Sequence, residues 1–169
     1  MPHPIWKIEV LSWVEIVYIE TTILGYLASR PSPRQQIAKR QKVTHFWWHE
    51  KREACRCVSS ELVRLEAREG NLEQARERLK YLEQVEIVEL NQEVEELAEI
   101  FVQKGRMPLS SLADAVHLAS ATLAGAHILL TWNCAHLANP DLLKSLRPLA
   151  DSLGYCLPRV CTPEELMEY

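Results

Sequence analysis

Short runs of strand-forming residues alternate with helical segments along this chain, and this alternation restricts its fold more than any other feature. The first run, residues 16–19, reads Ile-Val-Tyr-Ile with no polar interruption, which is typical of a strand buried on both faces. Further strands are predicted at residues 55–60, 85–90, 126–133 and, followed by a C-terminal turn, within 156–169. Strands that alternate with helices form a parallel sheet covered on both faces. We therefore predict an α/β fold, a three-layer α/β/α domain with a central, mostly parallel sheet of four to five strands.

The intervening segments carry helical periodicity and recognisable helix ends. Helices are predicted at residues 21–29, 33–51, 61–70, 71–84, 91–105, 110–125 and 140–153. Ser59 or Ser60 can cap the helix at 61–70, and Ser110 or Ser111 can cap the mostly apolar helix at 110–125. No internal repeat or linker divides these segments.

The length of 169 residues is suited to one domain with a sizeable core. We expect a single domain over residues 15–169, preceded by an N-terminal extension at 1–14. The apolar fraction of 47% and the charged fraction of 25% are those of a globular protein and argue against a disordered or fibrous chain. The first fifteen residues lack the pattern of a secretory signal, and no run is long and apolar enough to cross a bilayer, so we expect a cytoplasmic protein without a membrane segment.

The cysteines do not form a recognisable metal or disulfide pattern. There are five of them, and none stands in a Cys-x-x-Cys pair. This argues against a disulfide framework and against a zinc knuckle. We expect the thiols to serve mostly as small core residues in a reducing compartment.

Polar residues follow the first predicted strand directly. Glu20 comes after the apolar run, and Thr21 and Thr22 follow it. In an open parallel sheet, sites lie just beyond the carboxyl ends of the strands, so Glu20 is a candidate site residue. The same carboxylate could instead cap the next helix or be solvated.

Comparable residues follow the other strands. Glu66 is on the second turn of the helix after the second strand, where a solvated helix face is the alternative explanation. Asp114 is early in an otherwise apolar helix, where a cation would stabilise its charge. Thr131 and Asn133 end the fourth strand. Oxygen-rich ligands of this kind are suited to Mg²⁺ or Mn²⁺ better than to zinc.

Charge is distributed unevenly along the chain. The net charge is −4, yet no acidic residue occurs between Thr21 and His49, whereas residues 82–99 are dominated by glutamate. We expect a basic face on an acidic protein. The basic residues of this acid-free stretch are Arg30, Arg34, Lys39, Arg40 and Lys42.

Four segments in this order resemble the PIN-domain ribonucleases, especially the bacterial VapC-like toxins. They read VYIETTILGYL, SSELVRLEA, LADAVHLA and LLTWNCAHLAN, and the resemblance covers nearly the whole chain from residue 17 to 167. It implies catalytic positions at Glu20, Glu66, Asp114 and Asn133, of which Glu20, Glu66 and Asp114 would bind the metal. It also implies that Thr21, Thr22, His117 and Thr131 support the site. For His117, a hydrogen-bonded core histidine is the alternative favoured by its surroundings.

The resemblance also implies a function. A PIN-like domain of this kind would be a Mg²⁺- or Mn²⁺-dependent endoribonuclease that cuts single-stranded RNA and leaves a 5′-phosphate. It would be the toxin of a type II toxin-antitoxin pair, a homodimer with an antitoxin as partner. The basic residues above would hold the RNA backbone, and Phe46, Trp47 or Trp48 would stack on bases or, as we favour, pack in the core or a dimer interface.

Two other functions are compatible with the sequence. Glu20 stands where the family usually has aspartate, so the chain could be a catalytically weakened PIN-fold module that binds RNA or a protein partner. A phosphatase or a cyclic-nucleotide hydrolase of similar sheet architecture is supported only by analogy of fold. Metal-dependent cleavage of RNA separates the first alternative from the enzyme.

Overall fold

The computed structural model of the chain describes residues 14–108 and 111–168, so nearly all of the extension predicted at 1–14 lies outside the described residues. The strands are β1 (Glu15–Ile19), β2 (Cys55–Ser60), β3 (Glu86–Val88), β4 (Ile128–Leu130) and β5 (Arg159–Cys161). The α-helices are α1 (Thr21–Ala28), α2 (Gln35–Glu50), α3 (Glu61–Ala67), α4 (Leu72–Leu82), α5 (Gln92–Gln103), α6 (Leu112–Leu123), α7 (Pro140–Ser152) and α8 (Pro163–Met167). A 3₁₀ turn, η1 (Arg52–Ala54), precedes β2. None of the helices in this part of the chain has the length and apolar character needed to span a membrane.

The five strands form one sheet in the order β3-β2-β1-β4-β5. Every neighbouring pair is parallel, which confirms the predicted α/β sheet. β1 lies at the centre, with Ile19 opposite Leu130 of β4. Its residues Val17, Tyr18 and Ile19 are fully buried, as the uninterrupted apolar run predicted.

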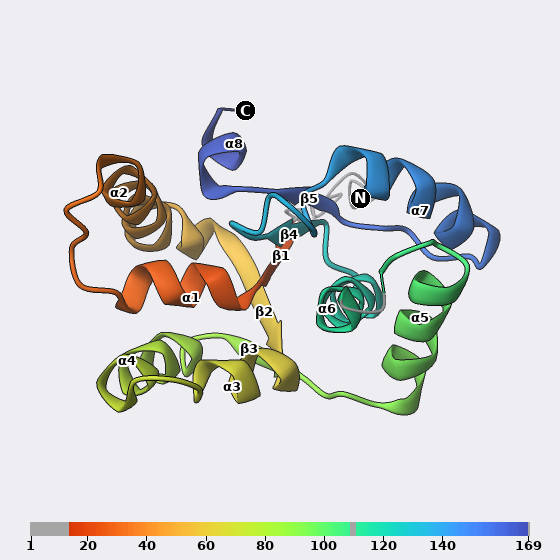
Figure 1. The fold of residues 1–169 in the computed structure, drawn as a ribbon, viewed down its shortest axis with the longest axis horizontal. Coiled ribbons are helices and arrows are strands. Elements are labelled where there is room, and N and C mark those ends of the chain that lie inside the picture. Colours follow the sequence, from red (N-terminus) through yellow and green to blue (C-terminus); the bar gives the residue numbers. More distant parts are fainter. Residues whose placement is uncertain (1–13, 109–110, 169) are drawn as a thin grey trace, which may run out of the picture.

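The order of the strands places a topological switch point beside β1. The chain moves outward from β1 to β2 and β3, then crosses back through α5 and α6 to β4 on the other side of β1. Because parallel connections are right-handed, this reversal puts the later helices on the opposite face of the sheet. Figure 1 shows α1, α2 and α4 on one side and α5, α6 and α7 on the other. The switch point between β1 and β4 is where ligands bind in open sheets of this kind.

The helix ends follow the local sequence, with two differences from expectation. Ser60 caps α3 by accepting a hydrogen bond from Val63 N at 3.5 Å, whereas Ser111 occupies the cap position of α6 without a side-chain bond. The C-terminal turn predicted after the fifth strand is wrong, because α8 forms there. Thr162 and Glu165 make a reciprocal capping box that starts this helix.

Two adjacent tryptophans belong to the core. Trp47 and Trp48 of α2 are each 2% exposed and pack edge to face with their ring centroids 6.4 Å apart. Phe46 is 50% exposed and lines a cavity with Glu15 and Cys55, the first residues of β1 and β2. These three rings therefore lie in the core or near the amino ends of the strands, which supports packing rather than base stacking.

The cysteines are all free thiols, in agreement with the absence of a disulfide pattern. Cys57 and Cys161 are buried and Cys55 is partly buried, so these three act as core residues. Cys134 and Cys156 are exposed, and the expected core role does not apply to them.

Two glycines in different surroundings lead to opposite predictions for stability. A Cβ at Gly105 would lie 2.4 Å from the backbone oxygen of Phe101 and 2.1 Å from a methyl carbon of Leu146, whereas a Cβ at Gly25 in α1 meets nothing within 4 Å. We expect Gly105→Ala to lower the free energy of unfolding by about 2 kcal/mol, as overpacking does. Gly25→Ala, its control, should raise it by about 0.5 to 1 kcal/mol, since alanine favours helix. Urea denaturation measures both changes, and equal effects would contradict the described packing around Gly105.

Candidate functional site

Glu20 lies at the carboxyl end of β1 and is 5% exposed. Its Oε2 accepts hydrogen bonds from Thr22 N at 3.1 Å, from Thr131 Oγ1 at 2.7 Å and from the hydroxyl of Thr22. The bond from Thr22 N makes Glu20 the N-cap of α1, so the capping alternative is correct. Capping does not remove Glu20 from the site, because the cap itself stands at the switch point between β1 and β4.

Glu66 reaches the same place from the second turn of α3. Its Oε2 accepts a hydrogen bond from the hydroxyl of Thr21 and lies 3.1 Å from Nε2 of His117. The side chain is 27% exposed. This glutamate is therefore not on a freely solvated helix face.

His117 comes from α6 and is 2% exposed. Its Nδ1 lies 3.1 Å from the hydroxyl of Tyr18, which in turn is 2.7 Å from Oγ of Ser60. His117 is thus a hydrogen-bonded core histidine, as the sequence favoured, and it also contacts Glu66. Sequence reasoning missed Tyr18 and Ser60. The signal for Tyr18 was a phenol within an otherwise aliphatic buried strand, because buried phenol hydroxyls need a partner.

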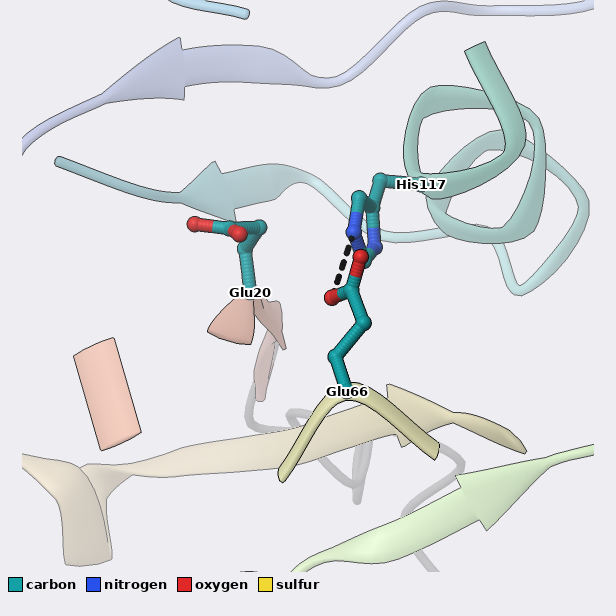
Figure 2. Close-up of side chains that lie close together, drawn as sticks. All are labelled: Glu20, Glu66 and His117. Carbon is teal, nitrogen blue, oxygen red and sulfur yellow. Dashed lines mark hydrogen bonds and ion pairs between the residues drawn. The ribbon is translucent and has the colours of Figure 1, made fainter. Parts of the chain in front are cut away.

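Glu20, Glu66 and His117 form one cluster (Figure 2). One potential ligand atom from each lies within 4.8 Å of the other two. Figure 2 shows that the three side chains come from three different elements, with Glu66 and His117 joined by their hydrogen bond. Two of the three predicted metal ligands are therefore adjacent in the fold.

Asp114, the third predicted ligand, is outside this cluster. It stands in the first turn of α6, and its Oδ1 accepts a hydrogen bond from Nδ2 of Asn133 at 3.0 Å. Asn133 is fixed in turn by its own backbone N–H, which donates to Thr131 Oγ1 at 2.9 Å. Asp114 and Asn133 thus form a second polar pair, electrostatically coupled to Glu66 and His117.

The pKa values of the site reflect burial and mutual charge. Burial alone would raise the pKa of Glu66, but the hydrogen bond and charge of His117 and the bond from Thr21 hold it below its ordinary value. Burial alone would lower the pKa of His117, but Glu66 and the charges of Glu20 and Asp114 raise it. Burial raises the pKa of Asp114. The site therefore holds more acidic than basic groups, an arrangement that a bound cation stabilises.

These shifts predict how stability depends on pH in the metal-free protein. A group whose pKa is raised in the folded state contributes stability that is lost as the pH rises through that pKa. The free energy of unfolding should therefore decrease as the pH increases above 6.5, the unfolded value for His117. Urea titrations at several pH values test this, and His117→Gln should flatten the decrease. His45, whose pKa burial lowers, changes stability below its unfolded value of 6.5 and therefore does not account for a decrease above it. An unchanged slope in His117→Gln would contradict the prediction.

The five cations predicted to bind RNA differ in their contacts within the structure. Arg30 pairs with Glu73 at 2.7 Å, and Lys39 pairs with Glu164 at 2.5 Å. The guanidinium of Arg40 stands 5.0 Å from the ring centroid of Trp132, which precedes Asn133 in the chain. The remaining two cations, at the start and on the exposed side of α2, are Arg34 and Lys42.

Comparisons with known proteins agree with the fold. A family model described as PIN domain matches residues 17–133, and no curated protein matches the chain. A VapC20 structure from Mycobacterium tuberculosis, described as a sarcin-ricin loop cleaving toxin, is 16% identical with a TM-score of 0.50 over 67% of this chain and 86% of its own. A VapBC2 structure from Rickettsia felis, bound to a DNA fragment from its promoter, is 15% identical with a TM-score of 0.49 over 87% and 98%. At an identity this low, the VapC20 structure shows likeness of fold alone.

Proposed function

The chain belongs to the PIN-domain family, and from that premise we propose that it is a divalent-metal-dependent endoribonuclease acting on single-stranded RNA. The observation that carries this proposal is the cluster of Glu20, Glu66 and His117 at the switch point of the sheet. Buried carboxylates that converge on one point repel each other unless a cation neutralises them. Such a cluster of interacting ionisable groups is typical of a functional site.

The two carboxylates of the cluster are suited to a hard cation. All the hydrogen bonds described for Glu20 and for Glu66 fall on Oε2 of each residue, which leaves Oε1 of each to face a ligand. Carboxylate oxygens are what Mg²⁺ and Mn²⁺ prefer. We propose that Glu20 and Glu66 hold the metal, with Asp114 as a third carboxylate. A bound ion of this kind would supply an activated water and stabilise charge on the reacting phosphate.

The remaining residues would orient the substrate and the acids. Thr22 and Thr131 fix the carboxylate of Glu20 through hydrogen bonds, and Asn133 fixes Asp114. Arg40, held over Trp132 and within 3.2 Å of the Tyr26 hydroxyl, would bind an RNA phosphate beside this edge. The other cations of the acid-free stretch would contribute longer-range attraction for RNA.

The proposal extends to a biological role. We propose that the chain is the toxin of a type II toxin-antitoxin pair, acts in the cytoplasm as a homodimer and binds a cognate antitoxin. Its motifs support this, and a solved protein of similar fold, VapC20, is described as a toxin. A short open reading frame beside the gene, with a product that binds this chain, would be the expected partner. If no such partner exists, the proposed toxin role would be wrong, and the proposed ribonuclease activity would be unaffected.

Metal-dependent cleavage is the direct test. The purified protein should cut 5′-labelled single-stranded RNA in the presence of Mg²⁺ or Mn²⁺, leave 5′-phosphate ends and lose its activity on addition of EDTA. Re-addition of metal in excess should restore the activity. A protein that binds RNA without cutting it in either metal would instead be a PIN-fold binding module. Two observations favour that second candidate, namely the three donors already bound to Glu20 and the position of Asp114 outside the cluster.

A further inference from the structure

A continuous chain of hydrogen bonds connects the interior of the sheet to the candidate site. It runs from Ser60 Oγ to Tyr18 Oη at 2.7 Å, from Tyr18 Oη to His117 Nδ1 at 3.1 Å, and from His117 Nε2 to Glu66 Oε2 at 3.1 Å. Ser60 and Tyr18 are fully buried, and His117 is 2% exposed. Ser60, Tyr18 and His117, from β2, β1 and α6, are therefore linked without access to water, so each of their polar atoms must find its partner within the protein. Glu66 of α3, whose side chain is 27% exposed, ends the series.

The Glu66 carboxylate is the acceptor at the end of this series of hydrogen bonds, and it determines which atom donates in each of them. An ionised Glu66 carboxylate can only accept, so the facing Nε2 of His117 must carry a proton. In the neutral ring Nδ1 is then an acceptor, and the Tyr18 hydroxyl is the donor that reaches it. Ser60 Oγ already accepts the backbone N–H of Val63, and its own proton is available for Tyr18. Burial raises the pKa of Tyr18, so its hydroxyl stays protonated and able to donate.

From this geometry we infer that Tyr18 is a positioning residue for Glu66, acting through His117, and that His117 does not bind the metal. The inference rests on the proposed function, since it concerns the orientation of one proposed metal ligand. A proton on Nε2 occupies the lone pair that coordination would need, although this atom lies 3.1 Å from Glu66 Oε2 and one ring nitrogen of His117 is within 4.8 Å of a carboxylate oxygen of Glu20 and of Glu66. The Glu66 carboxylate is thereby held through Oε2, with Oε1 available to the metal. A site with oxygen ligands only then favours Mg²⁺ or Mn²⁺ over zinc.

The first test needs neither metal nor RNA. Long-range ¹H–¹⁵N spectra of metal-free wild-type protein at alkaline pH, where the ring is neutral, report which imidazole nitrogen carries the proton. The signals of His117 are identified by their loss in His117→Gln. We expect the Nε2–H tautomer. An Nδ1–H tautomer would overturn the inference, whatever the outcome of the cleavage assays.

The second test measures Mn²⁺ affinity in the full chain by calorimetry. Tyr18→Phe removes the donor to Nδ1 and should raise the Kd for Mn²⁺ about tenfold, the size of effect expected for a partner of a ligand. The control is Tyr155→Phe, which removes a hydroxyl bonded to Glu93 instead and should leave the Kd unchanged. Thermal unfolding without metal confirms that both variants are folded. Equal affinity of Tyr18→Phe and wild type would overturn the positioning role, whereas a wild type that binds no Mn²⁺ would contradict the proposed function instead.

The third test examines the metal ligands directly and needs no variant that could fail to fold. Pulsed electron paramagnetic resonance of the Mn²⁺-loaded wild type detects nitrogen bound to the ion. We expect no ¹⁴N coupling of the strength that a coordinated imidazole produces. Such a coupling would overturn the inference and make His117 a ligand.

Discussion

Glu20→Gln should reduce RNA cleavage by about a thousandfold at saturating Mg²⁺. The substitution keeps the size of the side chain but removes the charge that would face the metal. Metal ions contribute several kcal/mol to transition-state stabilisation, and each ~1.36 kcal/mol corresponds to a factor of ten in rate. Initial rates on labelled single-stranded RNA measure the effect. Cleavage by Glu20→Gln at the wild-type rate would show that Glu20 is not a metal ligand.

Two further variants make this result interpretable. Glu20→Asp keeps the charge, restores the residue usual in the family and places a preferred N-cap residue at the start of α1, so it should retain or increase activity. Glu77→Gln removes a charge paired with Lys80 on the surface of α4 and should leave the rate unchanged. A rate for Glu20→Asp as low as that of Glu20→Gln would mean that the longer glutamate is required for the geometry of this site.

Trp47→Ala should lower the free energy of unfolding by about 3 to 5 kcal/mol. Trp47 is among the largest fully buried side chains and packs against Trp48, so its removal leaves a cavity in the layer between α2 and the sheet. Large-to-small substitutions of buried aromatic residues have costs of this size, because the lost transfer free energy and the cavity add. Equilibrium denaturation in urea measures the change.

Phe46 provides the matched control one residue away. It is half exposed, so Phe46→Ala should change the free energy of unfolding by about 0.5 kcal/mol or less. It also lies near the amino ends of β1 and β2, so the Kd for single-stranded RNA should stay the same in this variant. A loss of RNA affinity in Phe46→Ala with unchanged stability would instead assign base stacking to this ring.

The architecture could be predicted from the sequence because it depends on local patterns. The apolar run at 16–19 predicted a strand buried on both faces, and the alternation of strands with amphipathic helices predicted a parallel sheet, both of which the structure confirms. The helix boundaries were predictable to within a few residues from Ser, Asn, Gly and Pro signals, whose effects act within one turn. The final helix was missed even though its capping residues, Thr162 and Glu165, are visible in the sequence.

The composition of the site depended on distances that no local pattern encodes. The sequence by itself determined that carboxylates follow β1 and β2, and family resemblance selected Glu20, Glu66 and Asp114 among them. Only the tertiary structure brought His117 beside the first two, placed Asp114 with Asn133, and linked Tyr18 and Ser60 to Glu66. The physical reason is that periodicity fixes the face on which a residue lies within its own element, whereas the crossover from β3 to β4 determines which elements meet at the switch point.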